Sequence, residues 1–266
     1  MLLDNIPSNQ IKNNFERNTL KHIIPTKSIL LPSFSKPKCY VPLPVRKEFE
    51  NPISLAKIQQ IDYRKGYHFK PITLTDKFAH STVKFLRSFA DFYFKKDYNK
   101  RAVALETVAA IPGMIGGLYR HLYSLRSLKD NGEKISKLLK EAENERQHLL
   151  AFLAIKKPSI IDKILIHAVQ PLFFSFYFML YGFMPKTAHR FVGYLEEEAI
   201  RSYDMYEEEI LKGNIKNVDI SEGAKSYWKM PDNAKLLDLV RAVRADEAAH
   251  RDANHEFANE KPFKLA

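Results

Sequence analysis

Two short segments of the chain place a glutamate three residues before a histidine. They are Glu145 with His148 in NERQH, and Glu247 with His250 in ADEAAH. On a helix, residues three apart share a face, so each pair can offer a carboxylate oxygen and an imidazole nitrogen to one point. Such groups bind metal ions, and the two pairs together would supply part of a two-metal site.

The neighbouring residues argue against a simpler interpretation, in which both pairs lie on solvated helix faces. Each pair falls inside an apolar stripe at helical spacing. The stripes are Leu138, Ala142, Glu145, His148, Leu149 and Phe152, and Val240, Val243, Glu247, His250 and Asn254. Burying an ionised carboxylate costs several kcal/mol unless a cation or hydrogen bonds compensate it. A bound metal is therefore the simplest explanation.

A two-metal site in a helical bundle needs one further glutamate from each of two other helices. Glu106 is the first candidate, because it lies in an apolar stripe with Val103 and Ala110 and is the only acid of its helix before Asp130. Elimination therefore makes Glu106 the ligand from the third helix.

The second candidate comes from the segment GYLEEEAIRSY, in which three glutamates compete. Only Glu196 lies in an apolar stripe, which it shares with Ala199, Ile200 and Tyr203. Glu197 and Glu198 align with polar residues, so we expect at least Glu197 to be solvated or to support the ligands from outside. Four helices would then contribute the ligand set.

The donor types limit which metal can bind. Carboxylates with one imidazole per metal suit iron or manganese better than zinc or copper. Cys39 is the only cysteine, which excludes an intrachain disulfide and any cysteine-built metal site. Open coordination positions on a reduced metal pair would bind O₂.

Helices must position these residues, and long intervals between helix-breaking residues indicate where the helices lie. Their periodicity predicts six helices, at roughly 75–95, 100–128, 133–156, 159–184, 186–211 and 232–258. No run of alternating β-branched residues indicates a sheet. The sequence therefore predicts an all-α fold, a ferritin-like four-helix bundle with a metal core that occupies residues 73–260.

The preceding residues have a different composition. Eight of the fourteen prolines lie between Pro7 and Pro71, and proline interrupts regular helices. We expect residues 1–72 to form an extended arm that lies on a partner subunit. The first residues lack the apolar core of a secretory signal, and residues 1–27 match an organelle transit peptide poorly.

One predicted helix is long and apolar enough to cross a membrane. Ile164–Met184 contains 21 residues without a charged side chain. Because Glu106 precedes this segment and Glu196 follows it, a single crossing would separate the two halves of the site. We therefore expect the segment to lie on one leaflet, with a wholly buried core helix as the alternative.

The predicted helix 75–95 also favours a membrane surface, because it combines phenylalanines with basic residues. Aromatic and basic faces together suit an anionic leaflet. The net charge of +11 then requires no nucleic acid as a partner.

Four segments in order resemble the alternative oxidase family, cyanide-insensitive ubiquinol oxidases of the mitochondrial inner membrane. They are LETVAAIPGM from Leu105, NERQHL from Asn144, LEEEA from Leu195 and RADEAAHRDANH from Arg244. The resemblance covers roughly residues 75–258 and implies that the same six glutamates and histidines bind two iron ions. It further implies ubiquinol oxidation with reduction of O₂ to water, and a homodimer on the matrix side of one leaflet, with the arms gripping the partner.

The resemblance also assigns roles to residues around the metals. Tyr203 matches a tyrosine proposed to transfer electrons, although a core tyrosine is the alternative. Three residues would orient the ligands, namely Asn144, Asp246 and Trp228. The ubiquinol pocket would involve Arg87, Arg101, Leu105, Leu195, Ala199 and Ser202. Arg87 and Arg101 are equally compatible with surface positions that contact lipid phosphates.

The sequence departs from the family pattern at two positions. Gln147 stands where family members commonly have methionine. Cys39 does not clearly match the regulatory cysteines of plant members, so the sequence gives no basis for predicting thiol control. Three other functions are compatible with these motifs. The first is a plastoquinol oxidase of the same family, which differs mainly in its compartment. A diiron hydroxylase of a quinone precursor or lipid shares the bundle, as does an iron-storage protein.

Overall fold

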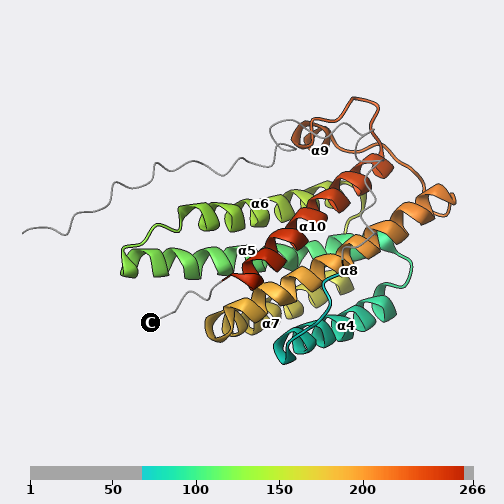
Figure 1. Ribbon diagram of the computed structural model, residues 1–266. Coiled ribbons are helices and arrows are strands. Elements are labelled where there is room, and N and C mark those ends of the chain that lie inside the picture. Colours follow the sequence, from blue (N-terminus) through green and yellow to red (C-terminus); the bar gives the residue numbers. More distant parts are fainter. Residues whose placement is uncertain (1–67, 261–266) are drawn as a thin grey trace, which may run out of the picture. The chain divides into compact units, whose positions relative to one another are not determined.

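The computed structural model describes residues 68–260, which contain seven α-helices (Figure 1). The helices are α4 (Leu74–Phe94), α5 (Tyr98–Ser127), α6 (Gly132–Ile155), α7 (Ile160–Phe183), α8 (Pro185–Leu211), α9 (Glu222–Tyr227) and α10 (Leu236–Asn259). No strand occurs within this range, and the all-α prediction is confirmed. Most of the predicted arm, including Cys39, lies outside the described residues.

Local chemistry explains where several helices begin. In α4, the Thr73 hydroxyl accepts a hydrogen bond from the Asp76 backbone N–H, and the Asp76 carboxylate accepts one from the Thr73 N–H. Ser159 and Asp162 form the same reciprocal cap at the start of α7. These caps satisfy backbone donors that the first turn of a helix leaves without partners.

The six predicted spans correspond to α4, α5, α6, α7, α8 and α10, with two differences. The sixth prediction started at residue 232, whereas α10 begins at Leu236. The short helix α9 was not predicted, because its six residues are too few to show a helical period.

Four helices form the bundle in two packed pairs, α5 with α6 and α8 with α10 (Figure 1). Glycines allow a close approach within each pair. A Cβ on Gly113 of α5 would lie 2.5 Å from the carbonyl oxygen of Leu138 in α6, and a Cβ on Gly193 of α8 would lie 2.4 Å from the ring of His255 in α10. Only glycine fits at these two crossings.

Two hydrophobic clusters fill the bundle along its length. One contains Val103 of α5 and Tyr203 of α8, and the other contains Ile111 of α5 and Val192 of α8. On both helices, the segment between the two clusters carries one of the candidate ligands.

Helices α4 and α7 pack on the bundle but leave most of their apolar side chains exposed. Only three of the 24 residues of α7 are buried, so the alternative of a wholly buried core helix is wrong for this chain. Helices α5 and α7 are both long and apolar enough to cross a membrane by composition. However, α5 packs along α6 within the bundle.

Candidate metal centre

Six buried side chains from four helices meet in the middle of the bundle. They are Glu106 from α5, Glu145 and His148 from α6, Glu196 from α8, and Glu247 and His250 from α10. Each is at most 8% exposed. These are the residues that the sequence stripes selected, and the structure brings all of them to one place.

The six side chains form two overlapping groups, each with donor atoms within 4.8 Å of one another. The first contains Glu106, Glu145, His148 and Glu247, and the second contains Glu145, Glu196, Glu247 and His250. Because Glu145 and Glu247 belong to both groups, each could bridge two metal ions. This is the arrangement expected of a two-metal carboxylate site.

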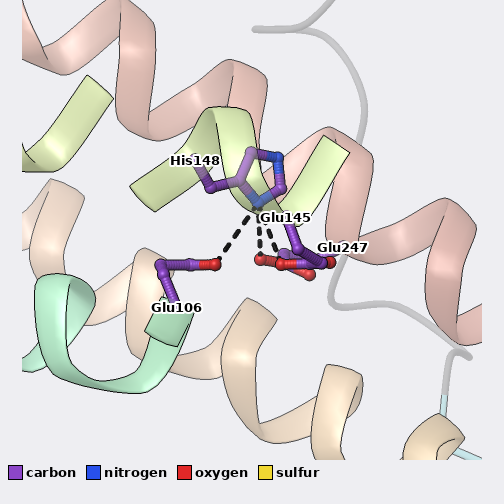
Figure 2. A group of neighbouring side chains, drawn as sticks. All are labelled: Glu106, Glu145, His148 and Glu247. Atoms are coloured by element: carbon purple, nitrogen blue, oxygen red, sulfur yellow. Dashed lines mark ion pairs between the residues drawn. The ribbon is translucent and has the colours of Figure 1, made fainter. Parts of the chain in front are cut away.

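Figure 2 shows how the first group converges on His148. Its Nδ1 atom lies 3.3 Å from Glu145 Oε2, 3.4 Å from Glu247 Oε1 and 3.6 Å from Glu106 Oε2. In the second group, Nδ1 of His250 lies 2.6 Å from Glu145 Oε1 and 3.5 Å from Glu247 Oε2. Both imidazoles therefore point a ring nitrogen at the shared carboxylates.

The buried polar atoms of this cluster fit a metal-binding role. Glu106 Oε2, both oxygens of Glu145, Glu247 Oε2 and the Nδ1 atoms of both histidines are buried without a hydrogen-bond partner. Leaving such groups unpaired is costly in the interior of a protein. Bound cations would compensate that cost, and oxygen with imidazole donors suits iron or manganese.

The pKa values of three residues in the cluster are raised, as expected where buried carboxylates lie close together. Burial, and then the charge of Glu145, raise the pKa of Glu106 to about 8. Burial and the charge of Glu247 raise the pKa of Glu196 well above its usual range. Although burial opposes it, the charge of Glu145 helps to raise the pKa of His250 to about 10. A bound cation would favour the deprotonated form of each of these three groups.

Asp246 connects Asn144 and Trp228, the other two residues that the family resemblance assigned to a supporting position, to His148. Its Oδ2 atom accepts hydrogen bonds from Trp228 Nε1 at 2.9 Å and from Asn144 Nδ2 at 3.2 Å, and it lies 3.2 Å from Nε2 of His148. Metal-ligating histidines commonly give their second ring N–H to a carboxylate in this way. Asn144, Asp246 and Trp228 thus form one hydrogen-bonded group next to His148.

Tyr203 lies directly beside the cluster. Its hydroxyl donates a hydrogen bond to Oε1 of Glu106, and the residue is buried. Burial and the charge of Glu106 raise the pKa of the tyrosine hydroxyl well above its usual range. The phenol therefore keeps its proton next to a candidate metal ligand.

Two of the residues expected at the quinol pocket, Arg87 of α4 and Arg101 of α5, are buried and share one partner, Asp91. Arg87 donates hydrogen bonds to Asp91 at 2.8 Å and to the Ser202 hydroxyl at 3.1 Å, and Arg101 also pairs with Asp91. The side chains of Arg87 and Arg101 are only 8% and 4% exposed. The alternative interpretation of these arginines as surface residues is therefore wrong.

The other residues expected at the quinol pocket are neighbours of the candidate ligands in the sequence. Leu105 precedes Glu106 on α5 and is 39% exposed. Leu195 and Ala199 are half-buried on α8, on either side of Glu196 in sequence. The residues expected at the pocket thus combine the exposed apolar side chain of Leu105 with the buried guanidinium groups of Arg87 and Arg101.

We expected Glu197 either to be solvated or to support the ligands from outside, and its burial rules out the first alternative. Its carboxylate accepts a hydrogen bond from the backbone N–H of Phe69 at 2.9 Å and lies 3.0 Å from Nε2 of His255. The segment before α4 and helix α10 together cover it, leaving the side chain 13% exposed.

Sequence reasoning also missed two residues near the cluster. Glu141 is buried one turn before Glu145, and its spacing of four residues from a predicted ligand was a signal that could have found it. Tyr227, whose hydroxyl accepts a hydrogen bond from Asn144 at 3.1 Å, gave no such signal because α9 is short.

A bundle of this kind, with glutamates from four helices and two Glu-x-x-His pairs directed inward, defines the class of two-metal carboxylate proteins. Within that class, the chain belongs to the alternative oxidase family, whose model matches residues 56–259. The resemblance noted from the sequence motifs is thereby confirmed.

Two relatives illustrate the similarity. The chain is 61% identical over 221 residues to a ubiquinol oxidase of Trachipleistophora hominis, an alignment that covers 83% of this chain and 70% of the relative. It is 51% identical over 220 residues to a mitochondrial ubiquinol oxidase of Batrachochytrium dendrobatidis, covering 82% of this chain and 70% of the relative.

Proposed function

We propose that this chain is a ubiquinol oxidase that reduces O₂ to water at a pair of iron ions without pumping protons. The observation that carries the proposal is the convergence of four buried glutamates and two histidines, beside Tyr203, in a member of the alternative oxidase family. Two ubiquinols would each give up two electrons and two protons, and one O₂ would accept all of them to form two water molecules. The names of the relatives support ubiquinol as the substrate.

The metal ligands would be Glu106, Glu145, His148, Glu196, Glu247 and His250. When bound, iron in this donor set would supply the redox chemistry through which quinol electrons reach O₂. The four carboxylates can balance the charge of two divalent cations, and a hydrophobic cluster lies on either side of them along the bundle. Asn144, Asp246 and Trp228 would keep the His148 ring in one orientation.

Tyr203 would transfer a proton and an electron at the edge of the centre. Its hydroxyl donates a hydrogen bond to the Glu106 carboxylate, so the tyrosine contacts a candidate ligand directly. A group that acts on the reacting atoms must lie within hydrogen-bond reach of them or of their ligands, and Tyr203 meets this condition.

The quinol head would bind where α4, α5 and α8 meet, near Glu106. The hydroxyl of Ser202 and the guanidinium of Arg87 provide polar partners for the quinol oxygens. Leu105, Leu195 and Ala199 provide apolar contacts, and Arg101 holds Asp91 against Arg87. This combination of apolar walls and a few polar groups is typical of small-molecule sites.

Helices α4 and α7 would lie on one leaflet of an anionic membrane, from which quinol enters. Their exposed apolar residues include Phe78, Phe85, Phe89 and Phe92 on α4, and Ile164, Leu172, Met179 and Phe183 on α7. Burying such side chains in lipid is favourable, and nearby lysines attract anionic headgroups. Relatives that are named mitochondrial support a mitochondrial location, and we propose the matrix side of the inner membrane.

The functional unit would be a homodimer, and each of its chains would consist of two segments. Residues 73–260 form the bundle with the metal centre, and residues 1–72 form the arm that contacts the partner subunit. The proline content of the arm supports this division.

The proposal is tested by oxygen uptake in membranes that contain the protein, with a short-chain ubiquinol as reductant and cyanide present. We expect cyanide-insensitive uptake that consumes about two quinols per O₂ and produces no peroxide, as the balanced reaction requires. A hydroxylated quinone or lipid product would contradict the oxidase and favour a hydroxylase. Iron uptake that proceeds equally well without quinol, with no quinol oxidation, would favour iron storage.

A further inference from the structure

Glu141 is a buried acid that the proposed chemistry does not use. It lies on α6 one turn before Glu145 and is 7% exposed. Its Oε1 atom accepts a hydrogen bond from Nδ2 of Asn254 at 2.8 Å, whereas its Oε2 atom is buried without a hydrogen-bond partner. Among the described residues, it is the only such carboxylate oxygen outside the six candidate ligands.

Asn254 ties Glu141 to the helix that carries His250. The same Nδ2 atom donates a second hydrogen bond to the backbone carbonyl of His250 at 2.9 Å, one turn earlier on α10. One amide group therefore joins the Glu141 turn of α6 to the His250 turn of α10.

A chain of buried polar groups holds Asn254 in this orientation. Its Oδ1 atom lies 2.9 Å from Nδ1 of His189 on α8. The other ring nitrogen of His189 lies 3.1 Å from the hydroxyl of Tyr181, which accepts a hydrogen bond from Arg120 at 3.1 Å. With His189 Nδ1 as donor, the amide oxygen of Asn254 is occupied and its N–H groups must face Glu141 and His250.

The two histidines of the centre thus have different surroundings. His148 has a carboxylate at its second ring nitrogen, provided by Asp246. On the His250 side, the nearby buried acid with a spare oxygen is Glu141. Outer carboxylates of this kind orient ligands and add negative charge, and their loss costs about 10–100-fold in metal affinity.

We propose that Glu141 is a positioning residue for the metal position bounded by Glu145, Glu196, Glu247 and His250. Held by Asn254, it fixes the His250 turn against the Glu145 turn and adds a negative charge beside that position. Asp246 performs the corresponding role for His148. This inference rests on the two-metal site proposed above.

The test is an anaerobic titration of purified full-length protein with Fe(II), and separately with Mn(II) as a redox-inert probe. The variants are Glu141→Gln, which keeps the shape but removes the charge, and Glu141→Met, which removes both polar atoms. Glu143→Gln is the matched control, because Glu143 lies on the same helix but is 51% exposed and pairs with Arg146. The melting temperature of each metal-free protein is measured in parallel.

Both Glu141 variants should bind one of the two metal ions about 10–100-fold more weakly, while Glu143→Gln binds like wild type. Mössbauer spectra of the iron-loaded variants should show one altered iron environment and one unchanged. The metal-free melting temperature should not fall, because the substitution removes a carboxylate with an unpaired buried oxygen.

Unchanged metal affinity in both Glu141 variants would overturn this inference and leave the proposed function intact. A lower melting temperature or failure to fold without metal, with normal affinity where it can be measured, would show a merely structural role and also overturn it. A wild-type protein that binds neither metal would overturn both the inference and the proposed function.

Discussion

Nε2 of His148 and Oδ2 of Asp246 lie 3.2 Å apart, joining α6 to α10 immediately beside the candidate ligand Glu247. The same carboxylate accepts the indole N–H of Trp228, whose ring stacks on the His148 imidazole with centroids 5.9 Å apart. The His148 ring is therefore fixed from its edge and from its face. Its other nitrogen, Nδ1, is left to face the carboxylate cluster.

Replacing Asp246 by alanine should weaken iron binding about 10–100-fold, because the His148 ring loses the acceptor that orients it. Iron content after dialysis against a graded chelator measures this loss. Asp252→Ala is the control, since Asp252 lies on the same helix with its side chain 66% exposed. Equal iron retention in both variants would contradict the role given to Asp246.

Replacing Tyr203 by phenylalanine should lower quinol-driven oxygen uptake by about 10²-fold or more while iron content stays at the wild-type level. The ring and its packing remain, and only the hydroxyl that donates to Glu106 is lost. Tyr206→Phe, one turn further along α8, removes a hydroxyl that donates to Asn99 instead and should retain activity. If Tyr203→Phe turns over like wild type, Tyr203 is a core tyrosine without a redox role.

Metal binding should release protons near neutral pH. Burial and the charge of Glu145 raise the pKa of Glu106 to about 8, so the metal-free carboxyl is mostly protonated at pH 7. A metal requires the deprotonated form, so affinity rises as pH increases from about 6 to 8, by about tenfold per pH unit for each proton released. An indicator dye in weak buffer measures the release. A binding constant independent of pH across this range would exclude a protonated ligand.

Removing two exposed phenylalanines from α4 should weaken association with anionic vesicles. Phe85 and Phe89 are 73% and 56% exposed, and burying one such side chain in an apolar phase contributes about 1.5–3 kcal/mol. Phe85→Ser with Phe89→Ser is compared in a vesicle sedimentation assay with Leu211→Ser, a change of an equally exposed residue at the end of α8. Loss of binding only in the Leu211 variant would place the membrane surface elsewhere.

The helices and the six candidate ligands could be found from the sequence because their signals are local. The breakers and the caps at Thr73 and Ser159 lie next to the helices they delimit. A glutamate inside an apolar stripe, such as Glu106, indicates its own burial from residues within two turns of the helix.

Other features depended on contacts between residues far apart in the sequence. The spacing of Glu141 from Glu145 indicates the same helix face, but its hydrogen-bond partner Asn254 lies 113 positions away. Glu197 is covered because the chain before α4 returns to α8, with Phe69 128 positions earlier in sequence. No periodicity within one helix predicts either contact.

The most direct test of the metal centre is the iron content and oxygen uptake of Glu247→Ala, because Glu247 belongs to both groups of candidate ligands. Glu256→Ala on the same helix, with its side chain 71% exposed, is the control. We predict that the Glu247 variant retains at most half of the wild-type iron and loses cyanide-insensitive uptake with a short-chain ubiquinol, while the control keeps both. Wild-type iron content with unchanged turnover in Glu247→Ala would contradict the ligand assignment.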